Sequence, residues 1–145
     1  MLNRVFVAVI AVALPHGGTS HAADDGAAKA NFEITGDAEK GEKVFRKCKA
    51  CHEVGDGAAS KAGPALNGVL GRTAGSVEDF KYSNALTEKA TADELVWTPE
   101  TLAEFLTKPK DYIKGTKMAF AGLRKEDDRA NVIAYLAQFS GEASD

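Results

Sequence analysis

The chain of 145 residues is poor in aromatic side chains, which make up 8% of it and include a single tryptophan. Its own side chains could therefore build only a modest core, and a large apolar cofactor would add to that core. Hydrophobic residues at 44% and charged residues at 27% nevertheless favour a globular protein over a disordered one. The length indicates one domain.

The apolar run near the start of the chain is too short to span a bilayer, which takes about 20 residues. It extends from Val5 to Leu14, ten residues, and follows Arg4. A small, polar stretch ending at Ala22 and Ala23 comes after it. This order is typical of a cleaved secretory signal. We predict a signal peptide over 1–23 with export to the periplasm, a flexible leader over 24–35, a domain over 36–140 and a tail over 141–145.

Positive charge is in deficit overall, which argues against nucleic acid as a partner. The formal net charge is −3, and it becomes −4 without Arg4, because residues 1–23 contain no Asp or Glu. Cations are nonetheless concentrated between residues 108 and 125, where Asp111 is the one anion. We therefore expect a dipolar molecule with one basic face. The cations of this segment are Lys108, Lys110, Lys114, Lys117, Arg124 and Lys125.

The sequence has no strand-like alternation and no internal repeat, and it predicts an all-α protein with long ordered loops. Asp37 and Thr98 are good N-caps, and Pro99 suits a first helical turn. A Gly-rich loop is expected over 53–81, and a charged loop over 111–122. One predicted helix opens at Gly36 and Asp37 and runs through Cys51. The others are predicted over 83–89, from Thr98 to Pro109, and from Asp127 or Asp128 through Phe139.

The chemistry is concentrated in one pentad, Cys48-Lys49-Ala50-Cys51-His52. A C-x-x-C-H motif is typical of covalent haem attachment. Two thiols at this spacing, on one turn, can add to two vinyl groups of a porphyrin. The imidazole that follows then faces the iron from the same side. The sequence therefore predicts one haem c, held by Cys48 and Cys51 and ligated by His52.

Other uses of the two cysteines are less favoured. A disulfide between Cys48 and Cys51 is compatible with an oxidising compartment. A thioredoxin-like dithiol would need a βαβ setting, which the sequence does not suggest. A zinc site would need a second pair of ligands, and the remaining histidines, His16 and His21, lie in the predicted signal.

Met118 is the candidate for the second axial ligand. It is the only methionine after the predicted signal, and it lies in a loop among charged residues, a poor setting for a core methionine. Histidine with methionine is a standard axial pair in c-type cytochromes. The predicted metal ligands are therefore His52 and Met118.

In their order along the chain, these motifs resemble those of class I c-type cytochromes, in particular the bacterial cytochrome c2 and mitochondrial cytochrome c group. The resemblance covers about Gly36 to Phe139. The matching pieces are Gly41 and Phe45, residues 63–68, Gly71-Arg72, Phe80-Lys81-Tyr82, Trp97, Tyr112-Ile113, residues 115–120 and residues 132–136.

The resemblance implies the small cytochrome c fold, in which crossed terminal helices, short helices and long loops surround one haem. It implies that the Pro64 carbonyl accepts a hydrogen bond from His52 and that Phe120 lies beside the exposed haem edge. The contact between the first and last helices would be formed by Gly41, Phe45, Val132 and Tyr135, and the haem propionates would be bound by Arg72, Tyr82 and Trp97.

The resemblance also implies a function. The protein would be a monomeric, non-enzymatic one-electron carrier that takes electrons from a quinol–cytochrome c oxidoreductase and passes them to a terminal oxidase, a photosynthetic reaction centre or a similar acceptor. It would dock transiently on these membrane complexes through Lys108, Lys110, Lys114, Lys117 and Lys125. A haem enzyme or a gas-binding cytochrome with a displaceable sixth ligand is the alternative. Two departures from the family pattern are Phe105, where many mitochondrial members have Tyr, and Lys114, in place of a common Pro.

Overall fold

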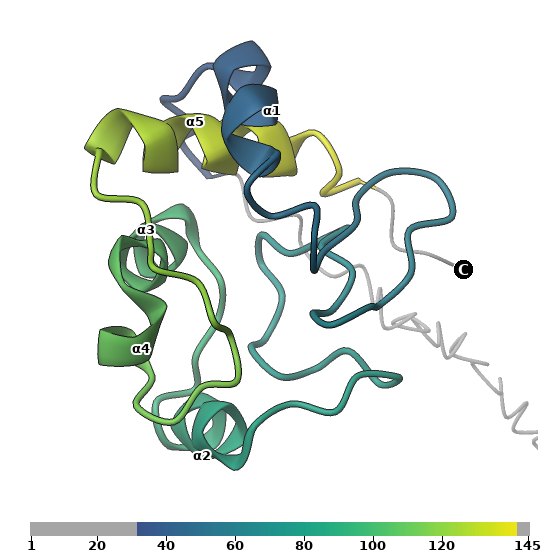
Figure 1. Cartoon of the computed structure of the whole chain (residues 1–145), viewed down its shortest axis with the longest axis vertical. Helices are drawn as coiled ribbons and strands as arrows, with labels where there is room; N and C mark the ends of the chain where they lie inside the picture. Colours follow the sequence, from purple (N-terminus) through teal and green to yellow (C-terminus); the bar gives the residue numbers. More distant parts are fainter. Residues whose placement is uncertain (1–31, 142–145) are drawn as a thin grey trace, which may run out of the picture.

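The computed structural model describes residues 32–141 as helices joined by long loops (Figure 1). No strand forms in this part of the chain, where an isolated bridge pairs Thr73 with Val96. The all-α prediction is therefore confirmed. The helices are α1 (Ala38–Phe45), α2 (Asn84–Ala92), α3 (Pro99–Thr107), α4 (Pro109–Tyr112) and α5 (Glu126–Ala137).

Part of the predicted domain organisation lies outside the described residues. This applies to the signal peptide at 1–23, to the first part of the leader at 24–31 and to the end of the tail at 142–145. Within residues 32–141, no helix combines the length and the apolar character that crossing a bilayer requires.

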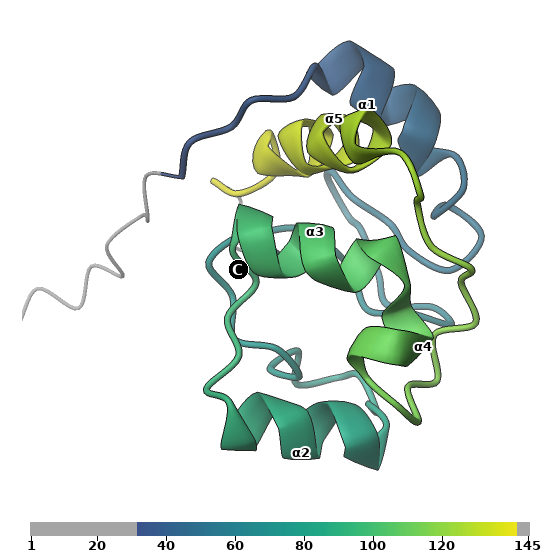
Figure 2. The same ribbon diagram turned by 90° about the vertical axis from the view of Figure 1, so that its left-hand side faces the viewer.

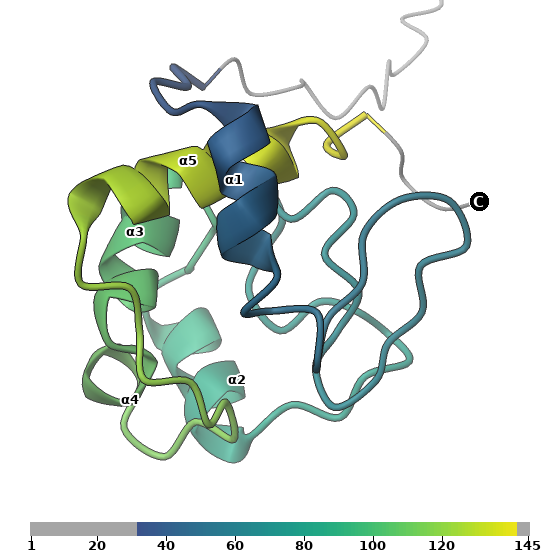
Figure 3. The same cartoon turned by 45° about the horizontal axis from the view of Figure 1, so that its top comes forward.

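Helices α1 and α5 cross at one end of the molecule (Figure 3). A Cβ atom on Gly41 would lie 1.9 Å from the backbone oxygen of Asn131, so only glycine permits this approach. Beside it, the rings of Phe45 and Tyr135 lie 5.3 Å apart between centroids. Phe45 is 1% exposed, as is Val132 on α5. The predicted contact between the first and last helices is confirmed.

The start of α1 combines a local cap with a distant one. The carboxylate of Asp37 accepts the backbone N–H of Lys40 at 3.0 Å, as the N-cap prediction requires. The backbone N–H of Asp37 donates to the side-chain oxygen of Asn131 at 2.8 Å. The second bond ties the start of α1 to α5, and it could not be predicted from the sequence.

The prediction of a helix through Cys51 was wrong over residues 46–51. Regular α-helix ends at Phe45, and the chain continues in tight turns. In these turns the N–H of Cys48 donates to the carbonyl of Phe45 at 2.7 Å, and that of Cys51 donates to Cys48 at 3.0 Å. Packing supplies most of the stability of a short helix. Beyond Phe45 the chain leaves α5 and lines a cavity instead (Figure 3).

The other helix starts agree with the sequence more closely. Thr98 and Thr101 form a reciprocal capping box at the start of α3, with side-chain bonds of 3.2 and 2.9 Å to each other's backbone N–H. Helix α5 begins at Glu126, one residue before the predicted range. The sequence missed α4, because Pro109 starts this single turn as well as limiting α3. Helices α5, α3 and α2 lie one below another in Figure 2.

Candidate functional site

A partly open cavity of about 490 Å³ lies between the helices and the loops. Its volume is within the range of small-molecule and cofactor sites. The walls come from the turns after α1, the loop before α2, the faces of α3 and α5, and the loop after α4. Every residue predicted for the site lines this cavity: Cys48, Cys51, His52, Pro64, Arg72, Tyr82, Trp97, Met118 and Phe120.

The rest of the wall is mainly apolar. The sequence did not show that these side chains face a common cavity. They include the buried residues Leu86, Leu102, Phe105, Leu106, Val132 and Leu136.

The pentad presents both thiols at the cavity. Cys48 is half-buried, Cys51 is exposed, and both are free. A turn closes the pentad, with the N–H of His52 donating to the carbonyl of Cys48 at 2.9 Å. Burial raises the pKa of the Cys48 thiol to about 11. A thioether carries no ionisable proton, so attachment of Cys48 to an apolar group suits this environment.

The His52 ring is held in one orientation. Its Nδ1 lies 2.7 Å from the carbonyl oxygen of Pro64, the hydrogen bond that the resemblance implied. With Nδ1 as the donor, Nε2 keeps its lone pair for a ligand. Burial lowers the pKa of His52, against the smaller, opposite effect of the Pro64 bond. The half-buried ring therefore favours the neutral form, which is the form that binds a metal.

Gly63 shapes the wall behind this ring, a role that the sequence had not revealed. A Cβ atom at this position would lie 2.3 Å from Cε1 of His52. The backbone can therefore approach the ring only because residue 63 has no side chain. A glycine directly before Pro64 was the available signal, but its reason lies in the tertiary contact.

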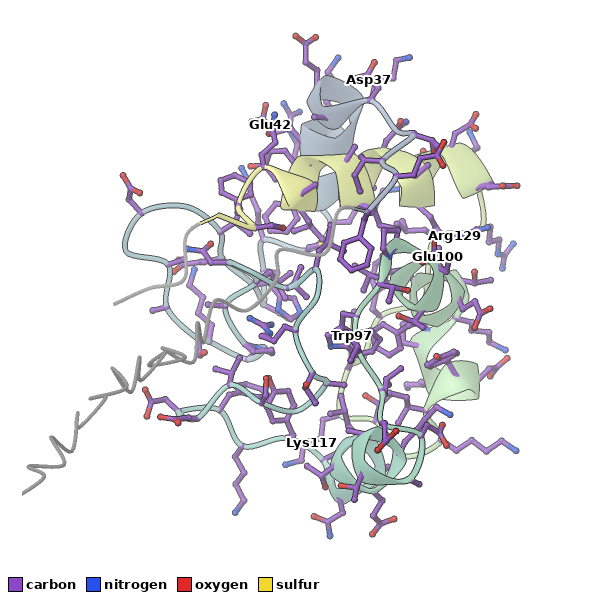
Figure 4. The ribbon with its side chains drawn as sticks, turned by 180° about the vertical axis from the view of Figure 1, so that it is seen from behind. Asp37, Glu42, Trp97, Glu100, Lys117 and Arg129 are labelled. Atoms are coloured by element: carbon purple, nitrogen blue, oxygen red, sulfur yellow. The ribbon has the colours of Figure 1, made fainter. Side chains whose placement is uncertain are left out.

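Met118 lies in the loop after α4, half-buried at the cavity. Its backbone N–H donates to the hydroxyl of Thr116 at 3.2 Å. The residue before Met118, Lys117, donates from its side chain to the carbonyl of Tyr82 at 3.4 Å and so joins this loop to the start of α2 (Figure 4). These contacts hold the segment that presents the thioether to the cavity.

Arg72 brings a half-buried positive charge to the cavity. Its guanidinium donates to the carbonyls of Ala65, at 3.2 Å, and Asn67, at 3.0 Å. Burial lowers the pKa of Arg72, and the nearby Tyr82 opposes this in part. No salt bridge within residues 32–141 includes Arg72. An anionic group of a ligand would offset the cost of burying this charge.

The aromatic residues of the site divide into two settings. Trp97 is 7% exposed and packs in the interior against Phe105, with the ring centroids 5.0 Å apart and the ring planes tilted by 45° (Figure 4). Tyr82 and Phe120 are half-buried. Burial raises the pKa of the Tyr82 phenol, which therefore remains a hydrogen-bond donor at neutral pH.

The predicted basic residues are all exposed. Lys117 also lines the cavity, whereas Lys108 is paired with Asp111 at 2.7 Å. The segment from 108 to 125 therefore carries solvent-accessible cations beside the loop that holds Met118.

The residues of the cavity fit a haem. Two thiols, an imidazole and a thioether are the attaching and ligating groups of a c-type haem, and the walls are mostly apolar. The guanidinium of Arg72, which forms no salt bridge within residues 32–141, suits a carboxylate. Among residues 32–141, no group of three or more His, Cys, Asp or Glu side chains is gathered as a separate metal site.

Comparisons with known proteins show the family of this chain. The family model for cytochrome c matches residues 38–140. The chain is 54% identical over 101 residues to cytochrome c2 of Agrobacterium tumefaciens (strain II Chrys), an alignment covering 70% of this chain and 90% of that protein. It is 49% identical over 105 residues to cytochrome c-550 of Ancylobacter novellus, an alignment covering 72% of this chain and 97% of that protein. The solved structure of cytochrome c2 from Rhodospirillum centenum has a TM-score of 0.68 at 41% identity, covering 72% of this chain and 98% of that one. The chain belongs to the cytochrome c family, and it is an electron-transfer cytochrome with a covalently attached haem c.

Proposed function

We propose that this protein is an exported one-electron carrier whose haem iron is ligated by His52 and Met118. One observation carries the proposal: a single cavity is lined by the imidazole, the thioether and both thiols of the pentad. Cys48 and Cys51 would hold the haem as thioethers. When bound, the haem supplies an iron that alternates between the ferrous and ferric states.

The two ligands would set the redox behaviour. The bond from His52 to Pro64 fixes the ring and makes it a stronger electron donor. The soft thioether of Met118 would favour ferrous iron against this donation, and the apolar walls would act in the same direction as the thioether. We therefore expect a fairly high reduction potential, suited to accepting electrons from a quinol-oxidising complex.

The remaining site residues would bind the rest of the haem. We assign Arg72, Tyr82 and Trp97 to the propionates, because the guanidinium, the phenol and the indole can all donate hydrogen bonds. Phe120, half-buried in the Met118 loop, would lie at the exposed haem edge.

Double ligation favours a carrier over the alternative of a haem enzyme or a gas-binding cytochrome. With His52 and Met118 both bound, no coordination position is open to oxygen or substrate. Carbon monoxide distinguishes the two: we expect little binding by the ferrous protein at neutral pH, and ready binding would favour the alternative.

The direct test is a redox titration followed by absorption, combined with mass spectrometry of the purified protein. We expect one reversible one-electron transition. The mass should equal that of a chain beginning after Ala22 or Ala23 plus one haem. Colourless protein from a host that matures c-type cytochromes would contradict the proposal.

The location and partners follow from the same proposal. A signal peptide over 1–23 would send the protein to the periplasm. There a quinol–cytochrome c oxidoreductase would be the donor, and a terminal oxidase, a photosynthetic reaction centre or a similar complex the acceptor. The chain would dock as a monomer through Lys108, Lys110, Lys114, Lys117 and Lys125, which are exposed beside the Met118 loop.

This docking surface predicts a dependence on salt. Raising the ionic strength from about 0.01 M to about 0.15 M should slow second-order electron transfer to an acidic partner by roughly tenfold, because salt screens the attraction. Stopped-flow kinetics would measure this. Lys114→Glu should reduce the rate at low salt, whereas Lys43→Glu, on the exposed face of α1, should change it much less. Equal effects of the two variants would contradict docking through this face.

A further inference from the structure

The loop that follows His52 is closed by a narrow neck, formed by residues 51–55 and 63–67. Two backbone bonds cross it: the N–H of Gly63 donates to Cys51, and that of Leu66 donates to Glu53, both at 2.9 Å. The side chain of Asn67 makes a third connection, to Gly55. His52 and Pro64 lie on opposite sides of this neck.

Asn67 contacts both polar groups of one residue. Its amide oxygen accepts the N–H of Gly55 at 2.8 Å, and its amide nitrogen donates to the Gly55 carbonyl at 2.9 Å. An asparagine side chain offers an acceptor and donors at this spacing, as a peptide group does. The Asn67 side chain therefore adds two hydrogen bonds across the neck, beside the two backbone hydrogen bonds.

We propose that Asn67 is a positioning residue that, by closing this neck, holds the Pro64 carbonyl against the His52 ring. The inference rests on the proposed function, because the orientation of this ring matters only if His52 ligates the iron. The bond it protects is the 2.7 Å contact between Nδ1 and the Pro64 oxygen.

Other contacts support the Pro64 segment from different sides. The guanidinium of Arg72 holds the carbonyls of Ala65 and Asn67. The N–H of Gly68 donates to Phe139, at the end of α5, at 2.9 Å. The hydroxyl of Ser60, within the loop itself, accepts the N–H of Ala65 at 3.2 Å. Within residues 32–141, Asn67 is thus the side chain, besides His52 itself, that joins the Pro64 segment to the chain leaving His52 by hydrogen bonds.

Loss of this clamp should affect His52 through its hydrogen bond. Donation from Nδ1 makes the imidazole more electron-rich, which favours ferric iron. A looser neck weakens this donation, so the protein should shift toward the ferrous state. It should also expose the ring N–H to exchange with solvent more often.

The experiment compares Asn67→Ala, Asn67→Asp and Asn84→Ala in the haem-loaded ferrous protein. Asn84 is an exposed asparagine at the start of α2 and serves as the control. Proton NMR would follow hydrogen exchange of the His52 ring N–H and of the Gly55 amide, and a titration would give the potential. For Asn67→Ala we expect both protons to exchange about tenfold faster, the factor that a net loss of one to two ordinary hydrogen bonds produces. The ferrous-to-ferric ratio at a fixed potential should rise about threefold.

Asn67→Asp retains the acceptor for Gly55 but loses the donor, so its values should lie between those of the wild type and Asn67→Ala. The Asn84→Ala variant should match the wild type. Unchanged exchange of the His52 ring proton in Asn67→Ala would overturn the inference, whether or not Gly55 exchanges faster. Failure of the proposed function would appear instead in the wild type, as a haem without His52 as a ligand.

Discussion

Replacing Met118 with alanine is expected to open one axial position of the haem and to lower the reduction potential by roughly 0.1–0.3 V. Axial ligands together cover a span of roughly 0.8 V, and a thioether favours the ferrous state. The absorption feature of a sulfur–iron bond in the ferric protein should vanish, and the ferrous protein should bind carbon monoxide readily. Absorption spectroscopy and a redox titration would measure all three effects.

The matched control for this variant is Phe120→Leu. Phe120 lies two residues further along the same loop and also lines the cavity, but it has no ligating atom. This variant should retain the sulfur–iron feature and resist carbon monoxide. If Met118→Ala kept the feature and the potential of the wild type, the thioether would not be the ligand, and the proposed ligation would be wrong.

The Gly41→Ala variant should lose roughly 3 kcal/mol of folding stability or fail to accumulate. The added methyl carbon would lie 1.9 Å from the Asn131 backbone oxygen and 2.7 Å from Cβ of Tyr135. Backbone on a packed helix cannot move aside as a flexible side chain can, so α1 and α5 would have to separate. Urea unfolding of the haem-loaded protein, followed by circular dichroism, would measure the loss.

Alanine normally stabilises a helix relative to glycine by about 1 kcal/mol. A loss in Gly41→Ala would therefore separate the close contact from helix propensity, because the two effects have opposite signs. Lys43→Ala, on the exposed side of the same helix, should stay within about 0.5 kcal/mol of the wild type. Wild-type stability of Gly41→Ala would mean that the two helices do not cross as closely as the structure describes.

Helix boundaries show where sequence-based prediction reaches its limit. Asp37 and Thr98 were predictable N-caps, because capping depends on residues three positions apart. The end of α1 at Phe45 and the single turn of α4 were missed. Both depend on where the chain meets or leaves its neighbours, which local propensity does not contain.

The sequence by itself determined the chemistry of this protein. The spacing of Cys48, Cys51 and His52, the isolated Met118 and the order of the surrounding motifs were enough to predict a covalent haem and an all-α fold. These features can be recognised in the sequence because they depend on residue types and short spacings, which are known without any knowledge of the fold.

The tertiary structure alone decided how the site is held. Gly63 must lack a side chain because the His52 ring occupies that space, and Asn67 closes the neck because Gly55 lies opposite it. Asn131 binds the N–H of Asp37 across 94 positions of sequence. Such contacts depend on distances between segments far apart in the chain, and those distances exist only once hydrophobic packing has brought the segments together.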